Sequence, residues 1–437
     1  MHEEIKIHML DIIKKDFRLI TCTGIMMLLL VARDILGVDI SDIIVTVICI
    51  LSMSCLKYAQ MVNYIFFMFP IMCGVPGYII STAYILLVIK GPRLKIRQIF
   101  PLLIVVILEI INESYRSIEG LHTGMLSFLS FTAIFFYFLD EDKSNKYSVR
   151  KSLIYYGLGT VFVFIVIYTN MFREYGITTI LSGMLRSGAL GVEGNDVTHM
   201  RGHLALNANT IAYMSISVVS IFSVMIEKIQ TKRIFYFSII AVCLFSGILS
   251  FSRTFIAAVV LFYILLLLTT RGAKKIKLGT LFLIVAIAAM FFFGDTILTI
   301  TDTFVGRAEE SNFTTAGGRT VLFKLYNEAW LNDFKYILFG TGAVSYFPVM
   351  HIYNAMHCGL QQIWVCLGIT GLLLYLIRGT IYLKRIYTGK IILYLPFIST
   401  LFFDQSIQFL SPYPLVLILL ATMQLPKIVY ENEYELS

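Results

Sequence analysis

Apolar runs of about 15 to 20 uncharged residues recur along this chain and constrain its fold more than any other feature. Apolar residues make up 58% of the 437 positions and charged residues only 14%, a balance typical of polytopic helical membrane proteins. We therefore expect an all-α fold: a polytopic integral membrane bundle in which residues 1–437 form a single domain.

The hydropathy pattern predicts about 12 to 14 membrane-spanning helices. The candidate spans are 19–36, 42–56, 61–73, 78–89, 99–112, 122–139, 152–171, 210–226, 234–250, 254–270, 278–294, 358–377, 391–404 and 412–425. Segments 61–73 and 78–89 are each shorter than the roughly 17 residues that a spanning helix needs, and the breaker GVPG joins them. They form two crossings, one bent helix or a re-entrant hairpin.

Clusters of Lys and Arg all fall on one side of the membrane if this short pair counts as two crossings. By the positive-inside rule that side is the cytoplasm, and both termini lie there. The N-terminus has no small-residue cleavage site, so we expect the first span to be retained. The same rule explains the net charge of +8, and nucleic acid is therefore not expected as a partner.

Two long segments, 172–209 and 295–357, then become extracytoplasmic loops. A loop as long as 295–357 is usually functional or disordered, and this one has too much apolar periodicity for disorder. Its stretch VLFKLYNEAWLNDF predicts an amphipathic helix on the membrane surface or over the mouth of the bundle. The apolar face of that helix contains Leu322, Leu325, Tyr326, Ala329 and Trp330. We expect loop 295–357 to cover an active site.

The cations assigned to the outer side are nearly all Arg, the residue that grips phosphate or carboxylate through two hydrogen bonds. Arg253, in FSRTF, stands between two apolar spans, and a membrane-embedded Arg costs about 2.5 to 3.5 kcal/mol even on the lenient insertion scale. We therefore expect Arg253 at the outer interface or in a wet cavity with an anionic partner. A snorkelling or helix-capping Arg is the alternative.

A second polar cluster ends loop 172–209 and opens a span, in the sequence THMRGHLALNANTIAY. Its members at the predicted helix entry are Arg201, His203, Asn207 and Asn209. A helix N-terminus attracts anions, and Arg201 strengthens that attraction. Asn209 is equally suited to be only an N-cap.

Two further candidates come from the long loop and its end. Arg319 precedes the amphipathic stretch, where a cation opposes the helix dipole, and this favours a bound anion over a structural role. His357 opens the next span and titrates near neutral pH, so it is a candidate proton acceptor, with an ordinary hydrogen-bonding role as the alternative.

Metal and redox chemistry are not expected. No HExxH or comparable carboxylate spacing accompanies the histidines, so we expect no protein-built metal site. Most of the seven cysteines lie in apolar segments without a CxxC pattern, which excludes a disulfide framework.

Five motifs in a fixed order resemble those of the O-antigen polymerase and ligase family of bacterial cell-surface polysaccharide assembly. These motifs are RGHLALNANTIAY at a span entry, SRT at an outer corner, GGR before Trp, GTG after it, and His357 followed by Gly368 and Gly371. The resemblance covers roughly residues 195–380. The family often has Asn-Pro-Asn where this chain has Asn207-Ala208-Asn209, and His-Asn where it has His357-Cys358.

The resemblance implies a GT-C-like glycosyltransferase in the bacterial inner membrane with its active site outside the cytoplasm. It would transfer a growing glycan from undecaprenyl diphosphate to a lipid-linked repeat unit, without nucleotide, metal or other cofactor. Arg201, Arg253 and Arg319 would bind the diphosphate, and His357 would act with Arg319 in catalysis. His203, Asn207 and Asn209 would contact the substrate elsewhere. The expected partners are the lipid-linked oligosaccharide, the bilayer, a chain-length regulator and a flippase.

Two other functions fit parts of this pattern. A ligase that passes finished glycan to another acceptor would present similar motifs. A lipid-linked oligosaccharide flippase would also be a bundle of this size, but a transporter should carry charge within its spans and a trace of an internal repeat. Intramembrane charges are few here, with Glu109 and Asp404 the main candidates, and this argues against transport.

Overall fold

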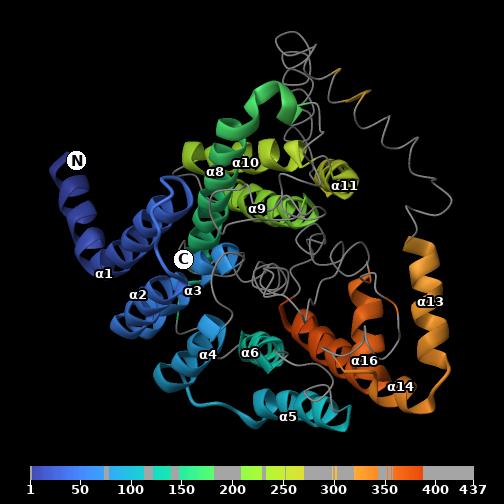
Figure 1. Cartoon of the computed structure of the whole chain (residues 1–437). Helices are drawn as coiled ribbons and strands as arrows, with labels where there is room; N and C mark the ends of the chain where they lie inside the picture. Colours follow the sequence, from blue (N-terminus) through green and yellow to red (C-terminus); the bar gives the residue numbers. More distant parts are fainter. Residues whose placement is uncertain are drawn as a thin grey trace.

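The computed structural model describes residues 2–72, 78–112, 122–138, 147–181, 208–228, 233–250, 252–269, 298, 301–302, 319–342, 352, 356 and 358–386. These residues form helices and no strand, so the predicted all-α fold class is confirmed for the described part of the chain (Figure 1). The helices are α1 (His2–Asp34), α2 (Asp42–Cys55), α3 (Tyr58–Ile71), α4 (Tyr78–Lys90), α5 (Ile96–Ile111), α6 (His122–Phe138), α8 (Val149–Leu181), α9 (Ala208–Lys228), α10 (Arg233–Leu249), α11 (Arg253–Thr269), α13 (Arg319–Leu331), α14 (Phe334–Phe339) and α16 (Gly359–Ile386).

The helices follow the apolar runs closely. Each predicted span within the described ranges coincides with a helix, and 61–73 and 78–89 correspond to two separate helices, α3 and α4. Segments 278–294, 391–404 and 412–425 lie outside the described residues. Apolar content alone was therefore enough to locate these helices.

Two helical segments in the described part of the chain are long and apolar enough to cross a membrane: Val149–Arg173 in α8 and Gly359–Arg378 in α16. Other helices are apolar but shorter, among them α2 (14 residues), α4 (13 residues) and α10 (17 residues). A bundle of about 12 to 14 crossings stays a prediction.

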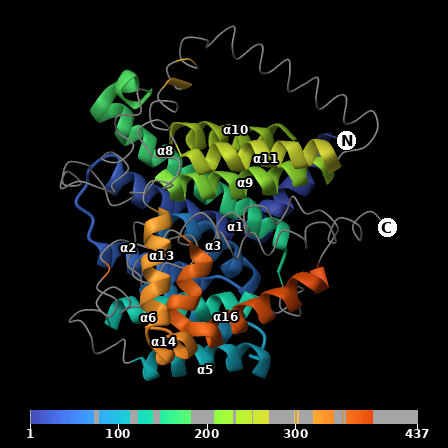
Figure 2. The same ribbon diagram turned by 90° about the vertical axis from the view of Figure 1, so that its right-hand side faces the viewer.

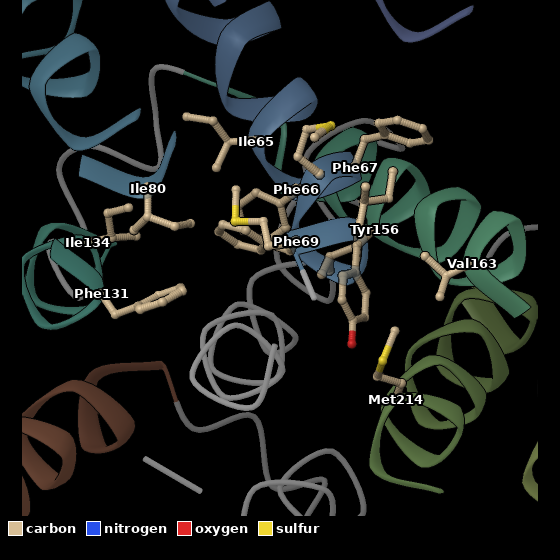
Figure 3. Close-up of a cluster of buried hydrophobic side chains, with 14 of the residues drawn as sticks. Ile65, Phe66, Phe67, Phe69, Ile80, Phe131, Ile134, Tyr156, Val163 and Met214 are labelled. Atoms are coloured by element: carbon tan, nitrogen blue, oxygen red, sulfur yellow. The ribbon is translucent and has the colours of Figure 1, made fainter. Parts of the chain in front are cut away.

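Helix α3 forms the centre of the core. Every side chain from Met61 to Ile71 is buried, as expected for a helix that is apolar on all sides. Figure 3 shows Phe66 and Phe69 of α3 between Phe131 of α6 on one side and Tyr156 of α8 on the other. Helix α3 therefore packs against both α6 and α8.

The contact between α3 and α8 depends on small and polar residues. A Cβ atom on Gly159 of α8 would overlap the carbonyl group of Phe67, so glycine allows the two backbones to approach. Near the start of both helices, the Ser152 hydroxyl donates a hydrogen bond to Asn63 Oδ1 at 2.7 Å. Both helices begin at the same end of this contact, so they run parallel.

Helix α5 buries two polar residues and exposes several large apolar ones. Ile96 is 81% exposed and Phe100 58% exposed, whereas Glu109 is fully buried and Gln98 is 3% exposed. Large exposed apolar side chains also occur on α2, α4, α10, α11 and α16. Such extended apolar surface is rare on soluble monomers and marks contact with lipid or another protein.

Candidate functional site

The first turns of α9 and α11 lie against each other. Phe222 near the end of α9 packs against Tyr236 near the start of α10, and Gly247 near the end of α10 lies against Phe255 near the start of α11. Helices α9 and α11, which are labelled in Figure 1, therefore begin at the same end of this layer. Ala212 and Ile216 of α9 form a buried cluster with Phe255 of α11. Asn209 and Arg253, which sequence analysis assigned to one outer site, therefore start two packed helices side by side.

The SRT corner fixes Arg253 as the first residue of α11. Ser252 is fully buried, its backbone N–H donates to Ser250 Oγ at 3.3 Å, and its carbonyl accepts from Phe255 N at 3.0 Å. Gly247 of α10 leaves the space that the Phe255 ring occupies. The N-terminal ends of two helices thus converge here, and their dipoles favour a bound anion.

The amphipathic helix predicted in the long loop is α13, which begins at Arg319. Figure 2 shows that α13 runs crosswise to α9, α10 and α11, as expected for a helix that covers the mouth of a bundle. Tyr326, on its predicted apolar face, is fully buried. Leu325 is 43% exposed, so the packed face is a narrower stripe than predicted. The rings of Phe323 and Trp330 both lie against Trp364 of α16.

A polar network holds α13 on α16. Asn327 Oδ1 accepts hydrogen bonds from Gln361 Nε2 and Trp364 Nε1, both at 3.2 Å. Trp330 donates through Nε1 to the Tyr336 carbonyl at 2.7 Å, and its ring lies 6.3 Å from that of Trp364. These contacts fix where the helix that begins at Arg319 lies.

The glycine turn after α14 docks into a break in α16. Gly368 has φ 66° and ψ −171°, which interrupts the helix. The backbone N–H groups of Thr341 and Gly342 donate to the carbonyls of Val365 and Cys366 at 3.0 and 2.9 Å. Those carbonyls lie within the last turn before the break, where helical partners are missing. The loop therefore caps the interrupted helix.

Beneath this junction the helices bury polar groups that sequence analysis gave no catalytic or binding role. Gln362 is fully buried, and neither polar atom of its side-chain amide has a hydrogen-bond partner among the residues that the structure describes. Glu109 of α5 is fully buried and interacts electrostatically with Cys366 and Tyr375 of α16. The signals in the sequence were a lone acid in PLLIVVILEII and a Gln pair at the opening of a span.

The structure tests the predicted site residues only in part. Arg201, His203, Asn207 and His357 lie outside the described residues. Asn209, Arg253 and Arg319 are described as backbone only, in the first turns of α9, α11 and α13. The predicted meeting of three guanidinium groups stays a prediction.

The described residues on either side of His357 in the sequence are Met356 and Cys358. Met356 is fully buried, and the carbonyl of Cys358 accepts from Gln362 N at 2.9 Å in the first turn of α16. Among the described residues, no group of three His, Cys, Asp or Glu side chains converges as metal ligands would.

No family model, curated protein or solved structure matches this chain.

Proposed function

We propose that this protein is a membrane-embedded polysaccharide polymerase of the O-antigen polymerase and ligase type. The observation that carries the proposal is the packing of the first turns of α9 and α11, which start at the motifs containing Asn209 and Arg253. These motifs are separated in sequence and share one helix-end environment suited to an anion. A lipid-linked diphosphate is the anion that the motif order implies.

The large exposed apolar side chains on several helices support contact with lipid. Apolar side chains face outward along α5, and Glu109 and Gln98 face inward. Together with the candidate spans in α8 and α16, this supports a membrane location. The multi-pass bundle of GT-C type in the bacterial inner membrane is the part of the proposal that comes from the motif resemblance. Both termini would be cytoplasmic, and α13 and the first turns of α9 and α11 would be extracytoplasmic.

The proposed reaction is one inverting displacement. A hydroxyl group at the free end of an incoming lipid-linked repeat attacks the anomeric carbon of the growing glycan. The bond from that carbon to the diphosphate oxygen breaks, and undecaprenyl diphosphate leaves with the electron pair. His357 accepts the hydroxyl proton, and Arg201, Arg253 and Arg319 neutralise the charge that develops on the diphosphate. His203, Asn207 and Asn209 would position the sugars.

We infer that α13, held on α16, covers the proposed active site. Fixed cations stabilise a departing diphosphate better when water is excluded. Gln361, Asn327 and Trp364 hold α13 in one position, and Arg319 begins that helix. The proposed role of α13 is therefore to carry one cation to the site and shelter the sugars from water.

The test is polymer formation in cells that carry single substitutions. Arg253→Ala and Arg319→Ala should abolish polymer while the protein remains in the membrane. Arg253→Lys keeps the charge but loses the two-pronged grip, so it should also impair synthesis. Full-length polysaccharide in the Ala strains would refute the proposal.

The product that accumulates separates polymerase from ligase. Loss of a polymerase stops synthesis at one lipid-linked repeat, whereas loss of a ligase leaves long lipid-linked polymer. We expect the single repeat.

A further inference from the structure

A cavity of about 530 Å³, lined mainly by polar and charged residues, lies at the other end of α8, away from the proposed active site. Its wall includes Lys57 and Asn63 at the start of α3, and Ser148 and Lys151 at the start of α8. Asp16 and Arg18 of α1 complete its charged lining. The helices therefore meet here around a space that polar and charged groups surround.

The cavity and the SRT corner lie at opposite ends of a candidate membrane span. Tyr168, near the end of that span, donates a hydrogen bond to the carbonyl of Ser246 at 2.9 Å, next to the corner at Ser252. Lys151 lies 17 residues earlier in the same helix, about 25 Å away at 1.5 Å per residue. That distance approaches the thickness of a bilayer core, so the cavity lies at the depth of the opposite headgroup layer.

The charge balance of the cavity favours an anion. Arg18, Lys57 and Lys151 are cationic, and Asp16 is the only acidic residue among those that line it. Lys151 Nζ and Asp16 Oδ2 form an ion pair at 2.7 Å, and among the described residues Arg18 and Lys57 have no carboxylate partner. Basic residues at this membrane face have a topological explanation, but topology alone does not require them to surround a cavity.

Two helix N-termini point their dipoles into the same space. α3 begins directly after Lys57 and α8 directly after Ser148, and both residues line the cavity. The Ser148 hydroxyl accepts from the backbone N–H of Lys151 at 3.3 Å, an N-cap for α8. Each helix end adds a partial positive charge of about half a unit.

Asn63 places an amide group at the wall of the cavity. Its side chain is only 4% exposed, yet it lines the cavity. Asn63 Oδ1 accepts from the Ser152 hydroxyl at 2.7 Å, so the Nδ2 group is the part of the amide that can donate to a ligand oxygen.

We propose that this cavity binds a phosphate group, carried by an anionic lipid headgroup or by a small soluble phosphate. Lys57 and the N-termini of α3 and α8 would hold its negative charge, and Asn63 would donate to one oxygen. Asp16 would weaken the site by occupying Lys151. In the proposed topology the cavity opens to the cytoplasmic leaflet, so it is separate from the proposed polymerase site.

Calorimetric titration of the full-length protein in a neutral detergent tests the proposal. The probes are dioctanoyl phosphatidylglycerol and inorganic phosphate, which distinguish a lipid from a soluble source. Lys57→Gln should weaken binding about ten-fold, as loss of one charge-assisted contact predicts. Asp16→Asn should tighten binding about three-fold or more, because it removes a competing charge and releases Lys151. These opposite signs cannot arise from a general loss of folding.

Lys335→Gln is the matched control, because it removes one exposed cation far from the cavity and should leave affinity unchanged. Lys57→Arg keeps the charge and should retain most of the affinity. Binding of either probe with the expected opposite signs supports the site and identifies its source. Binding of neither probe, or variants that all bind like the unaltered protein, overturns it. Polymer synthesis does not enter this readout, so failure of the proposed function would be seen separately.

Discussion

Gly340 lies against the backbone just before Gly368, and Gly368 lies against the backbone just before Gly340. A Cβ atom on Gly340 would overlap the carbonyl group of Cys366, and one on Gly368 would overlap that of Leu338. Both glycines have positive φ, 76° and 66°. The loop and the interrupted helix therefore meet backbone to backbone, with no room for a side chain.

Gly368→Ala should destabilise the protein. The backbone conformation alone costs about 1 to 3 kcal/mol for a non-glycine residue, and the overlap with Leu338 adds to this. Thermal unfolding of the purified protein measures the effect. Gly24→Ala is the control, because nothing lies within 4 Å of a Cβ atom there and alanine suits the interior of α1. Equal midpoints for the two variants would contradict the reported junction.

Asn327→Ala should loosen α13 from α16. The change removes the acceptor that Gln361 and Trp364 share. Gln361 Nε2 keeps its hydrogen bond to the Phe323 carbonyl at 2.8 Å. Trp364 Nε1 is therefore the donor that loses its partner, and the expected cost is about 0.5 to 1.5 kcal/mol. The two tryptophans of the chain, Trp330 and Trp364, lie at this junction, so emission reports on it directly. We expect a red shift and faster proteolysis. Lys324→Ala, on the exposed face of α13, should keep the original spectrum.

Tyr326 should make the α13 junction sensitive to alkaline pH. Burial, and to a lesser extent Cys366, raises the pKa of the Tyr326 phenol above its ordinary value of 10.0. The unfolded chain then loses this proton before the folded protein does, so the stabilising effect is complete below about pH 10 and declines as pH rises from there towards the folded pKa.

The measurement is tryptophan emission between about pH 8 and pH 12, a range that brackets the ordinary tyrosine pKa. Tyr326→Phe removes the titrating group, so the contact between α13 and α16 should persist to higher pH. The variant also loses the 3.3 Å hydrogen bond from the Tyr326 hydroxyl to the Ile352 carbonyl, which should lower stability only slightly. Identical pH curves for both proteins would exclude Tyr326 as the source.

Gln362→Met should raise the stability of the protein and lower the rate of the proposed glycan transfer. Within the described part of the chain, both polar atoms of the Gln362 amide are buried without partners, and such a group costs about 1 to 3 kcal/mol relative to an apolar one of similar size. Proteins retain this kind of cost mainly where function needs it. The paired measurements are the unfolding midpoint and the polymer yield. A variant that is more stable and fully active would mean that Gln362 has no part in the reaction.

Single-segment features were predictable from sequence. The apolar runs located α2, α10 and α11, because a helix in an apolar environment leaves a continuous hydropathy signal. Counting the predicted membrane crossings also placed the starts of α9 and α11 on the same side, and the buried cluster that contains Ala212 and Phe255 agrees with this. Whether the Arg201, Arg253 and Arg319 side chains converge stays a prediction.

Contacts between distant segments were not predictable. GTG and Gly368 were noted only for their order, and nothing local indicates that the N–H groups of Thr341 and Gly342 cap the carbonyls of α16. Charges around Lys57 and Lys151 were explained by topology, because hydropathy carries no information about which basic residues share a cavity. Gln362 was overlooked because an unsatisfied amide is a property of its surroundings.

The most direct test of the polymerase proposal is a reaction with purified components. The protein is placed in vesicles with a defined undecaprenyl-diphosphate-linked repeat, and the products are sized on a gel. We predict a ladder of polymers with the unaltered protein, single repeats with Arg253→Ala and Arg319→Ala, and sharply shortened products with Arg253→Lys. A ladder from the Ala variants equal to that of the unaltered protein, or none from the unaltered protein itself, would contradict the account.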